Sequence, residues 1–164
     1  MSIRHTPTLR AALPTDAAAL TALLHETFRD TWLPQLRQQA AQAWLRERQA
    51  ERYVAESGAA FVVATIGDAL AGFVHRDADF IHALHVSGRL RRHGIGQALL
   101  EQAEQAMREE GRTLSRLETD TFNMASRAFY IACGYREVAQ YPDEEWDSGF
   151  TTVLLTRPLL PATP

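Results

Sequence analysis

The spacing of the apolar residues changes near residue 60, and this change constrains the fold more than any other feature of the chain. From Leu20 to Phe28 apolar residues recur every three to four positions, which predicts an amphipathic helix. From Phe61 onward the chain carries short runs rich in valine, isoleucine and phenylalanine, which are typical of strands. Helices placed before and between such strands indicate an α/β fold.

The boundaries of the expected elements follow from these periods and from nearby glycine and proline residues. Strands are expected at 8–11, 60–66, 70–74, 80–86, 114–118, 135–140 and 150–155, and helices after a Thr15 or Asp16 cap and at 36–53, 94–111 and 125–133. The order βααβββαβαββ predicts one mixed sheet, because the turn at Gly67-Asp68 makes neighbouring strands antiparallel. With 164 residues, a single domain over 1–164 is expected.

Composition excludes several classes of protein. Seventeen basic and 20 acidic residues give a net charge of −3, and the arginines form no stripe, so a nucleic-acid partner is not expected. No apolar run approaches the roughly 20 residues of a membrane span, and Met1–His5 lacks the apolar segment of a secretory signal. We therefore expect a cytoplasmic protein with no membrane partner. All 17 basic residues are arginine.

A glycine-bearing turn, Arg91–Gly96, lies between an expected strand and an expected helix. The amides at a helix N-terminus have no partner within the helix, and glycine allows phosphate oxygens to reach them. Arg89, Arg91 and Arg92 add positive charge beside the turn. A pyrophosphate site fits this pattern, as does a plain strand-to-helix turn. A Rossmann site is disfavoured because its third glycine is Leu99 here, and a lysine-free chain has no P-loop.

Two segments together resemble motifs of the GNAT superfamily of N-acetyltransferases. Residues 84–100, LHVSGRLRRHGIGQALL, are similar to its acyl-CoA motif (Gln/Arg)-x-x-Gly-x-(Gly/Ala) after a strand. Residues 123–135, NMASRAFYIACGY, are similar to its second motif Asn-x-x-Ala-x-x-Phe-Tyr-x-x-x-Gly-Phe, with Ser126 in place of alanine and Tyr135 in place of phenylalanine. The resemblance spans Phe61 to Tyr135, whereas residues 1–55 share only the expected architecture.

The resemblance implies a GNAT-type fold, a mixed and mostly antiparallel central sheet with flanking helices, in which two splayed strands hold the pantetheine arm of acetyl-CoA. The backbone of Leu84, His85 and Val86 would then pair with the pantetheine, and Asn123 would contact the arm. Tyr130 would also lie at the cofactor. The pyrophosphate would lie on the turn and first helical residues, which are Arg91, Arg92, His93, Gly94, Ile95, Gly96 and Gln97.

The same resemblance implies acetyl transfer to a primary amine, with two catalytic side chains. Tyr130 matches the acid that protonates the leaving thiolate, and a phenol is still protonated at neutral pH. Glu118 matches the general base of ribosomal-protein N-terminal acetyltransferases. His82, His85 and Asp79 are the alternative bases, and strict strand alternation predicts that only one of the two histidines faces the acceptor.

No metal site is expected. His82 and His85 are three residues apart on a strand, so alternation predicts that they point to opposite faces. Cys133 is expected to pack as a small apolar residue, because no histidine pairs with it in the sequence.

The sequence does not identify the acceptor, which is a peptide N-terminus, a polyamine or another small amine. The acidic loop Asp143–Asp147, which contains Trp146, is a candidate for attracting a cation, or else a solvated hairpin loop. Further candidates around the end of the first helix are His25, Glu26, Phe28, Asp30 and Trp32. The rival hypotheses are a catalytically weak acyl-CoA-binding module and a different acyl donor. A homodimer through the C-terminal strands or the Trp44 helix is also open.

Overall fold

Seven strands and five α-helices are the main elements of the computed structural model, which describes residues 6–144 and 148–161. The strands are β1 (Thr8–Ala11), β2 (Phe61–Ile66), β3 (Ala69–Asp77), β4 (Phe80–Val86), β5 (Leu114–Asp120), β6 (Arg136–Pro142) and β7 (Thr151–Pro158). The helices are α1 (Ala17–Thr27), α2 (Gln38–Arg46), α3 (Gln49–Ser57), α4 (Ile95–Glu109) and α5 (Met124–Ala132).

All seven strands belong to one sheet, in the order β1-β2-β3-β4-β5-β7-β6. Every neighbouring pair is antiparallel except β4 and β5, which are parallel. The expected fold class, a mixed and mostly antiparallel sheet with flanking helices, is therefore confirmed.

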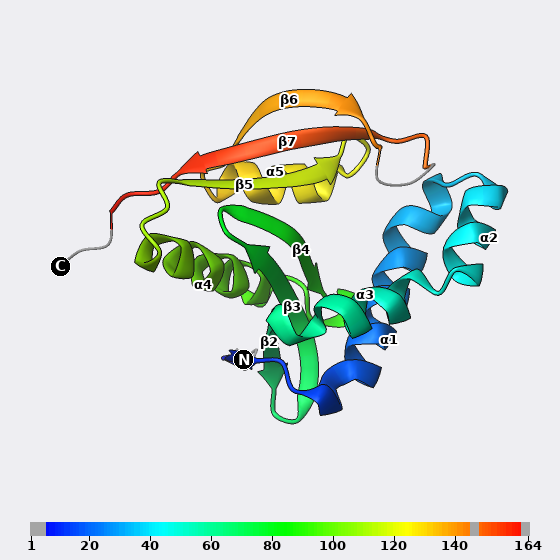
Figure 1. Cartoon of the computed structure of the whole chain (residues 1–164), viewed down its shortest axis with the longest axis horizontal. Coiled ribbons are helices and arrows are strands. Elements are labelled where there is room, and N and C mark those ends of the chain that lie inside the picture. The colour runs from blue at the N-terminus through cyan, green and yellow to red at the C-terminus, as the bar shows by residue number, and fades with distance from the viewer. Residues whose placement is uncertain (1–5, 145–147, 162–164) are drawn as a thin grey trace.

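The sheet opens between β4 and β5. These strands pair at only two positions, Phe80 with Arg116 and Ile81 with Leu117, and then diverge. The half that contains β5, β7 and β6 turns away from the half that contains β2, β3 and β4 (Figure 1). From His82 to Val86, β4 is thus not paired with β5, and its backbone on that side is open to a ligand.

Each face of the sheet has its own apolar core. On one face, α4 and α5 pack against the strands through residues such as Leu99 and Leu117. On the other, α1 and α3 pack through residues such as Leu20 and Phe73. Gly72 on β3 permits the close approach of the neighbouring strand β4, because a Cβ there would lie 2.6 Å from the His85 carbonyl oxygen.

Two local predictions are wrong. The expected single helix over 36–53 is two helices, because Arg48 adopts a left-handed conformation (φ 53°). The break lets Trp44 of α2 stack on Phe28 while Val54 of α3 packs in the sheet core. Asp16 does not cap α1 with its side chain, since its carboxylate instead accepts hydrogen bonds from the Leu13 amide and from Arg10.

Candidate active site

Two cavities flank the opening between β4 and β5. The first, here the glycine-turn cavity, has a volume of about 770 Å³ and lies against the β4–α4 loop, the start of α4 and α5. The second, here the aromatic cavity, has a volume of about 570 Å³ and lies between β4, β5 and the segment around α1 to α3. Seven residues line both cavities: Thr27, Trp32, Leu84, His85, Asn123, Ser126 and Tyr130. The cavities therefore meet along one seam.

The glycine-turn cavity has the features of an anion site. Gly94 has a left-handed φ of 79°, and the first hydrogen bond of α4 joins the Ala98 amide to its carbonyl at 3.0 Å. The three preceding helical amides thus have no partner within the helix and carry positive partial charge. Arg92 also has a positive φ, of 67°. Of the residues predicted to bind the cofactor, all but His93 line this cavity.

Gly96 has a packing role that the sequence did not indicate. A Cβ at this position would lie 3.3 Å from the ring of Phe129, so glycine lets the first turn of α4 approach α5. Glu26 on α1 supports the preceding loop, because its carboxylate accepts hydrogen bonds from the Ser87 hydroxyl and the Gly88 amide. The turn is thus held from both α5 and α1.

Tyr130 lies on the seam, largely buried on α5. Burial raises the pKa of its hydroxyl above the usual value, the neighbouring Cys133 adds to the shift, and a hydrogen bond with Ser126 offsets part of it. The hydroxyl is therefore protonated at neutral pH and available as a donor. Ser126 in turn accepts a hydrogen bond of 3.2 Å from the Thr119 hydroxyl on β5.

Asn123 also lies on the seam and caps α5. Its side-chain oxygen accepts a hydrogen bond of 3.1 Å from the Ser126 amide. Because the oxygen serves as the cap, the –NH₂ group is the part of this side chain that can donate to a ligand.

Glu118 lies on β5 and lines the aromatic cavity. Its side chain is exposed and accepts a hydrogen bond of 2.7 Å from the Tyr141 hydroxyl on β6. The sequence did not indicate this contact, because β6 reaches β5 only by way of β7 in the sheet order.

The prediction that only one of His82 and His85 faces the acceptor side is wrong. Arg76 pairs with Ile81 and His75 with Ala83, so His82 is an extra residue that forms a bulge in β4. The bulge interrupts strict alternation, and both histidines line the aromatic cavity. The same bulge removes the alternation argument against a metal site. Even so, no group of three or more potential metal-binding side chains occurs within 6–144 and 148–161.

His85 is neutral at neutral pH. Burial, together with the nearby positive charge of Arg91, lowers its pKa to about 4. Its Nδ1 hydrogen-bonds with the Thr27 hydroxyl at 2.9 Å, and its ring stacks on Phe73 with the centroids 5.2 Å apart. The imidazole is thus held in place between α1 and the sheet.

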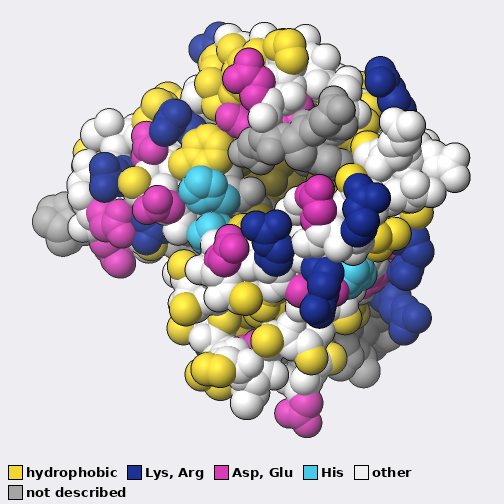
Figure 2. Space-filling model, turned by 45° about the vertical axis from the view of Figure 1, so that its right-hand side comes forward, with side chains coloured by type: hydrophobic (Ala, Val, Ile, Leu, Met, Phe, Trp, Pro, Cys, Tyr) yellow, Lys and Arg dark blue, Asp and Glu magenta, His cyan; other side chains and the backbone are white. Residues whose placement is uncertain are grey.

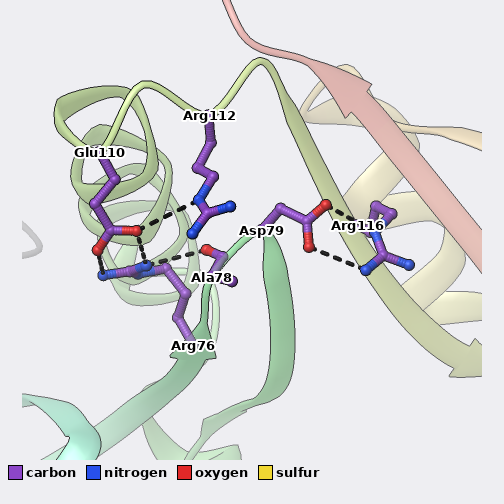
Figure 3. Close-up of polar contacts among 6 residues, drawn as sticks. All are labelled: Arg76, Ala78, Asp79, Glu110, Arg112 and Arg116. Carbon is purple, nitrogen blue, oxygen red and sulfur yellow. Dashed lines mark hydrogen bonds and ion pairs between the residues drawn. The ribbon is translucent and has the colours of Figure 1, made fainter.

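Asp79 is poorly placed to act as a base. Both of its oxygens accept hydrogen bonds of 3.0 Å from Arg116, and this pairing lowers the pKa of the carboxyl group (Figure 3). Asp79 lines neither cavity. It lies where β4 and β5 still pair, and its contact with Arg116 joins the β3–β4 turn to β5.

A carboxylate missed in the sequence, Asp120, also lines the aromatic cavity. It follows Glu118 by two positions, so both side chains share one face of β5. The expected strand ended at Glu118, whereas β5 continues to Asp120. Trp32 donates its indole N–H to Asp120 Oδ2 at 2.8 Å. An expected strand two residues longer would have placed Asp120 on the same face as Glu118. No sequence signal, however, indicates the contact with Trp32.

The remaining candidates have other surroundings. Trp32 and Phe28 line the aromatic cavity, whereas His25, Glu26 and Asp30 do not. Of the predicted acidic loop, Asp143 lines this cavity, and Trp146 lies outside the described residues. Cys133 packs against the α4–α5 core, and burial raises the pKa of its thiol.

Charges of both signs are interspersed on the face that carries α1 to α3 (Figure 2). This distribution agrees with the small net charge of the chain. Within the described part of the chain, no helix has the length and apolar character needed to cross a membrane.

A family model for the acetyltransferase (GNAT) family matches residues 17–135, which include the seam and both sequence motifs. This chain is a GNAT acetyltransferase. It is therefore an acyltransferase, and the predicted family is confirmed.

Solved structures of GNAT proteins have the same fold. A GCN5-related N-acetyltransferase from Rhodopseudomonas palustris aligns over 97% of this chain and 99% of its own, with a TM-score of 0.79 and 21% identity. PaiA N-acetyltransferase from Thermoplasma acidophilum, solved with coenzyme A, gives 93% and 99% coverage, a TM-score of 0.75 and 19% identity. The ribosomal-protein-S18-alanine N-acetyltransferase from Escherichia coli aligns over 96% of this chain and 97% of its own, with a TM-score of 0.68 and 19% identity. No curated protein matches the sequence.

Proposed function

We propose that this GNAT acetyltransferase transfers the acetyl group of acetyl-CoA to a primary amine, which attacks the thioester directly. The observation that carries the proposal is the seam, where an anion-binding cavity meets a cavity lined by carboxylates and aromatic rings. A donor in the first cavity and a cationic acceptor in the second would meet beside Tyr130. The solved PaiA structure with coenzyme A supports the choice of donor.

In this proposal the glycine-turn cavity holds the donor. The free amides of α4, with Arg91 and Arg92, bind the pyrophosphate. The backbone of Leu84 to Val86, which β5 leaves unpaired, binds the pantetheine arm, and Asn123 donates to it. A backbone N–H of β4 stabilises the charge that builds on the thioester oxygen.

The proposed reaction moves protons through Glu118 and Tyr130. The acceptor arrives as an ammonium ion and gives one proton to Glu118, and its nitrogen lone pair then forms the N–C bond. The C–S bond breaks, the sulfur takes a proton from Tyr130, and the amide nitrogen loses its second proton. Tyr130 regains a proton, and the net release is one proton per free thiol.

Turnover by variants tests these roles. Glu118→Gln and Tyr130→Phe are each expected to lower kcat about 100-fold or more, because each removes a proton-transfer group. The measurement is thiol release from acetyl-CoA with peptide N-termini, polyamines, aminoglycosides and small alkylamines as acceptors. Normal turnover by both variants contradicts the assigned roles.

Tyr135→Phe is the matched control, because it removes a buried tyrosine hydroxyl outside both cavities. Its kcat should be close to that of the wild type. A flat response of the wild type across the whole amine panel overturns the proposed function and favours an acyl-CoA-binding module. Competition between acetyl-CoA and succinyl-CoA, read by thermal shift, tests the choice of donor.

A further inference from the structure

Asp120 and Trp32 form a contact that the roles assigned so far do not use. Trp32 ends the π-helical turn Phe28–Trp32, which follows α1, and Asp120 ends β5. The indole N–H donates to Asp120 Oδ2 at 2.8 Å, across the opening of the sheet. The contact thus joins the helical segment after α1 to the half of the sheet that diverges from it.

The contact orients one carboxylate oxygen and leaves the other available. Asp120 lines the aromatic cavity, while Trp32 lies on the seam with its ring centroid 5.7 Å from that of His85. Because Oδ2 accepts the indole N–H, Oδ1 remains to accept a hydrogen bond from a ligand. Trp32 therefore fixes where that acceptor atom lies.

Asp120 lacks a cationic neighbour. No arginine or histidine nitrogen lies within 4.0 Å of its carboxylate in the portion of the chain that is described. Burial raises its pKa, the hydrogen bond from Trp32 offsets part of the rise, and the nearby carboxylates of Asp143 and Glu118 add to it. Partly buried carboxylates are ordinarily paired with a positive group, so a cationic ligand would complete this site.

The rest of the cavity wall suits the carbon chain of such a ligand. Phe28, Trp44, Tyr53 and Phe80 line the same cavity, so apolar surface lies beside the carboxylate. Aromatic faces also attract alkylammonium groups. The wall therefore favours an amine with an apolar or aromatic body.

We propose that Asp120, oriented by Trp32, binds the ammonium group of the acceptor, so that the acceptors of this enzyme are alkylamines that are cationic at neutral pH. This inference rests on the proposed function. It assigns Asp120 to docking of the amine, Glu118 to removal of its proton, and Trp32 to positioning of Asp120. Aniline-type amines, which are neutral at this pH, gain nothing from Asp120.

Binding in the absence of turnover tests the proposal. The protein is saturated with coenzyme A, and calorimetry measures the binding of 2-phenylethylamine and of its neutral analogue 2-phenylethanol. The wild type should bind the amine at least about 10-fold more tightly than the alcohol. Asp120→Asn should weaken amine binding about 10- to 100-fold, the range expected for a charged hydrogen bond, and leave alcohol binding unchanged.

Two further variants separate positioning from general damage. Trp32→Phe keeps a ring but removes the N–H, and should weaken amine binding less than Asp120→Asn does. Asp68→Asn removes the same charge from the exposed β2–β3 turn and should leave binding unchanged. The indole signal that disappears from the ¹⁵N–¹H spectrum of Trp32→Phe belongs to Trp32, and it should shift when the amine is added to the wild type.

The failures of the two proposals are distinguishable. Equal binding of amine and alcohol by the wild type, or unchanged amine binding by Asp120→Asn, overturns the docking role. No measurable binding of the amine overturns it as well. Selective, Asp120-dependent binding without thiol release from any amine instead upholds the docking site and overturns the proposed transfer reaction.

Discussion

At the scale of the residue, burial decides the charge of the groups on the seam. His85 lies between Phe73 and Trp32 with its Nδ1 on Thr27, and burial keeps its ring neutral at neutral pH. Tyr130 remains protonated for the same reason. Because His85 and Tyr130 are uncharged, the negative charge near the seam comes from the carboxylates that line the aromatic cavity.

The lowered pKa of His85 predicts an acid-sensitive fold. The pKa of His85 is about 4 in the folded protein and about 6.5 in the unfolded chain, so the unfolded state binds more protons between these values. Stability should fall as the pH drops through this window, by about 1.4 kcal/mol per unit and about 3 kcal/mol in all from this group. Denaturant unfolding between pH 7 and 4 measures the slope.

His85→Gln is the comparison for this prediction. Glutamine has no titratable group, so the variant should lose the part of the slope that His85 contributes. The pKa of His75 is also lowered by burial, and its contribution should remain in the variant. Identical slopes in the two proteins would show that His85 titrates normally in the folded state.

At the scale of the element, α4 is held in place by ion pairs of two kinds. Glu104, on its inner face, is 1% exposed and accepts hydrogen bonds from Arg157 of β7 at 2.7 and 3.0 Å. Tyr135 also donates to Glu104. Glu110, just past the end of the helix, pairs with Arg76 of β3 at the surface (Figure 3).

The two pairs should respond differently to the loss of their arginine. Arg157→Ala leaves a buried carboxylate for which Tyr135 is the one remaining donor among the described residues, and should lower the free energy of unfolding by about 2–3 kcal/mol. This value is below the usual range for buried pairs because Arg157 is itself partly exposed. Arg76→Ala is the surface control and should change stability much less. Equal losses in urea unfolding would contradict this ranking.

At the scale of the whole molecule, the lack of lysine matters for an enzyme proposed to acetylate amines. All 17 basic residues are arginine, so the α-amino group is the only primary amine of the chain. Incubation with acetyl-CoA should therefore add at most one acetyl group to an amine of the protein itself. Intact-mass and peptide mass spectrometry measure this, with a lysine-containing protein in the same tube as the positive control.

A second acetylated amine in the chain would contradict the expectation. If it holds, the acetylation that an added acceptor acquires can be counted without a background from the enzyme. The arginines of the β4–α4 loop keep a separate role, because Arg91 and Arg92 line the proposed pyrophosphate site.

Much of the fold was predictable from local patterns, and the same patterns pointed to the residues now proposed for the donor side. The glycine turn and Tyr130, which line the cavities, could be picked out in the sequence because each belongs to a motif within a short segment, and their roles there are proposals. The bulge at His82 and the break at Arg48 were not predictable. Neither has a glycine or proline to mark it, so the local sequence carries no signal for either.

The sequence by itself determined most of the helices and strands and the position of the glycine turn at the start of α4. Hydrophobic periodicity and the positions of glycines are local properties of the sequence, so they can be read without knowing which segments lie next to one another in the fold. Only the tertiary structure decided that both histidines face one cavity and that Trp32 meets Asp120 from 88 positions away. Strand register and long-range contacts depend on how the two halves of the sheet pack, and no periodicity within one segment specifies them.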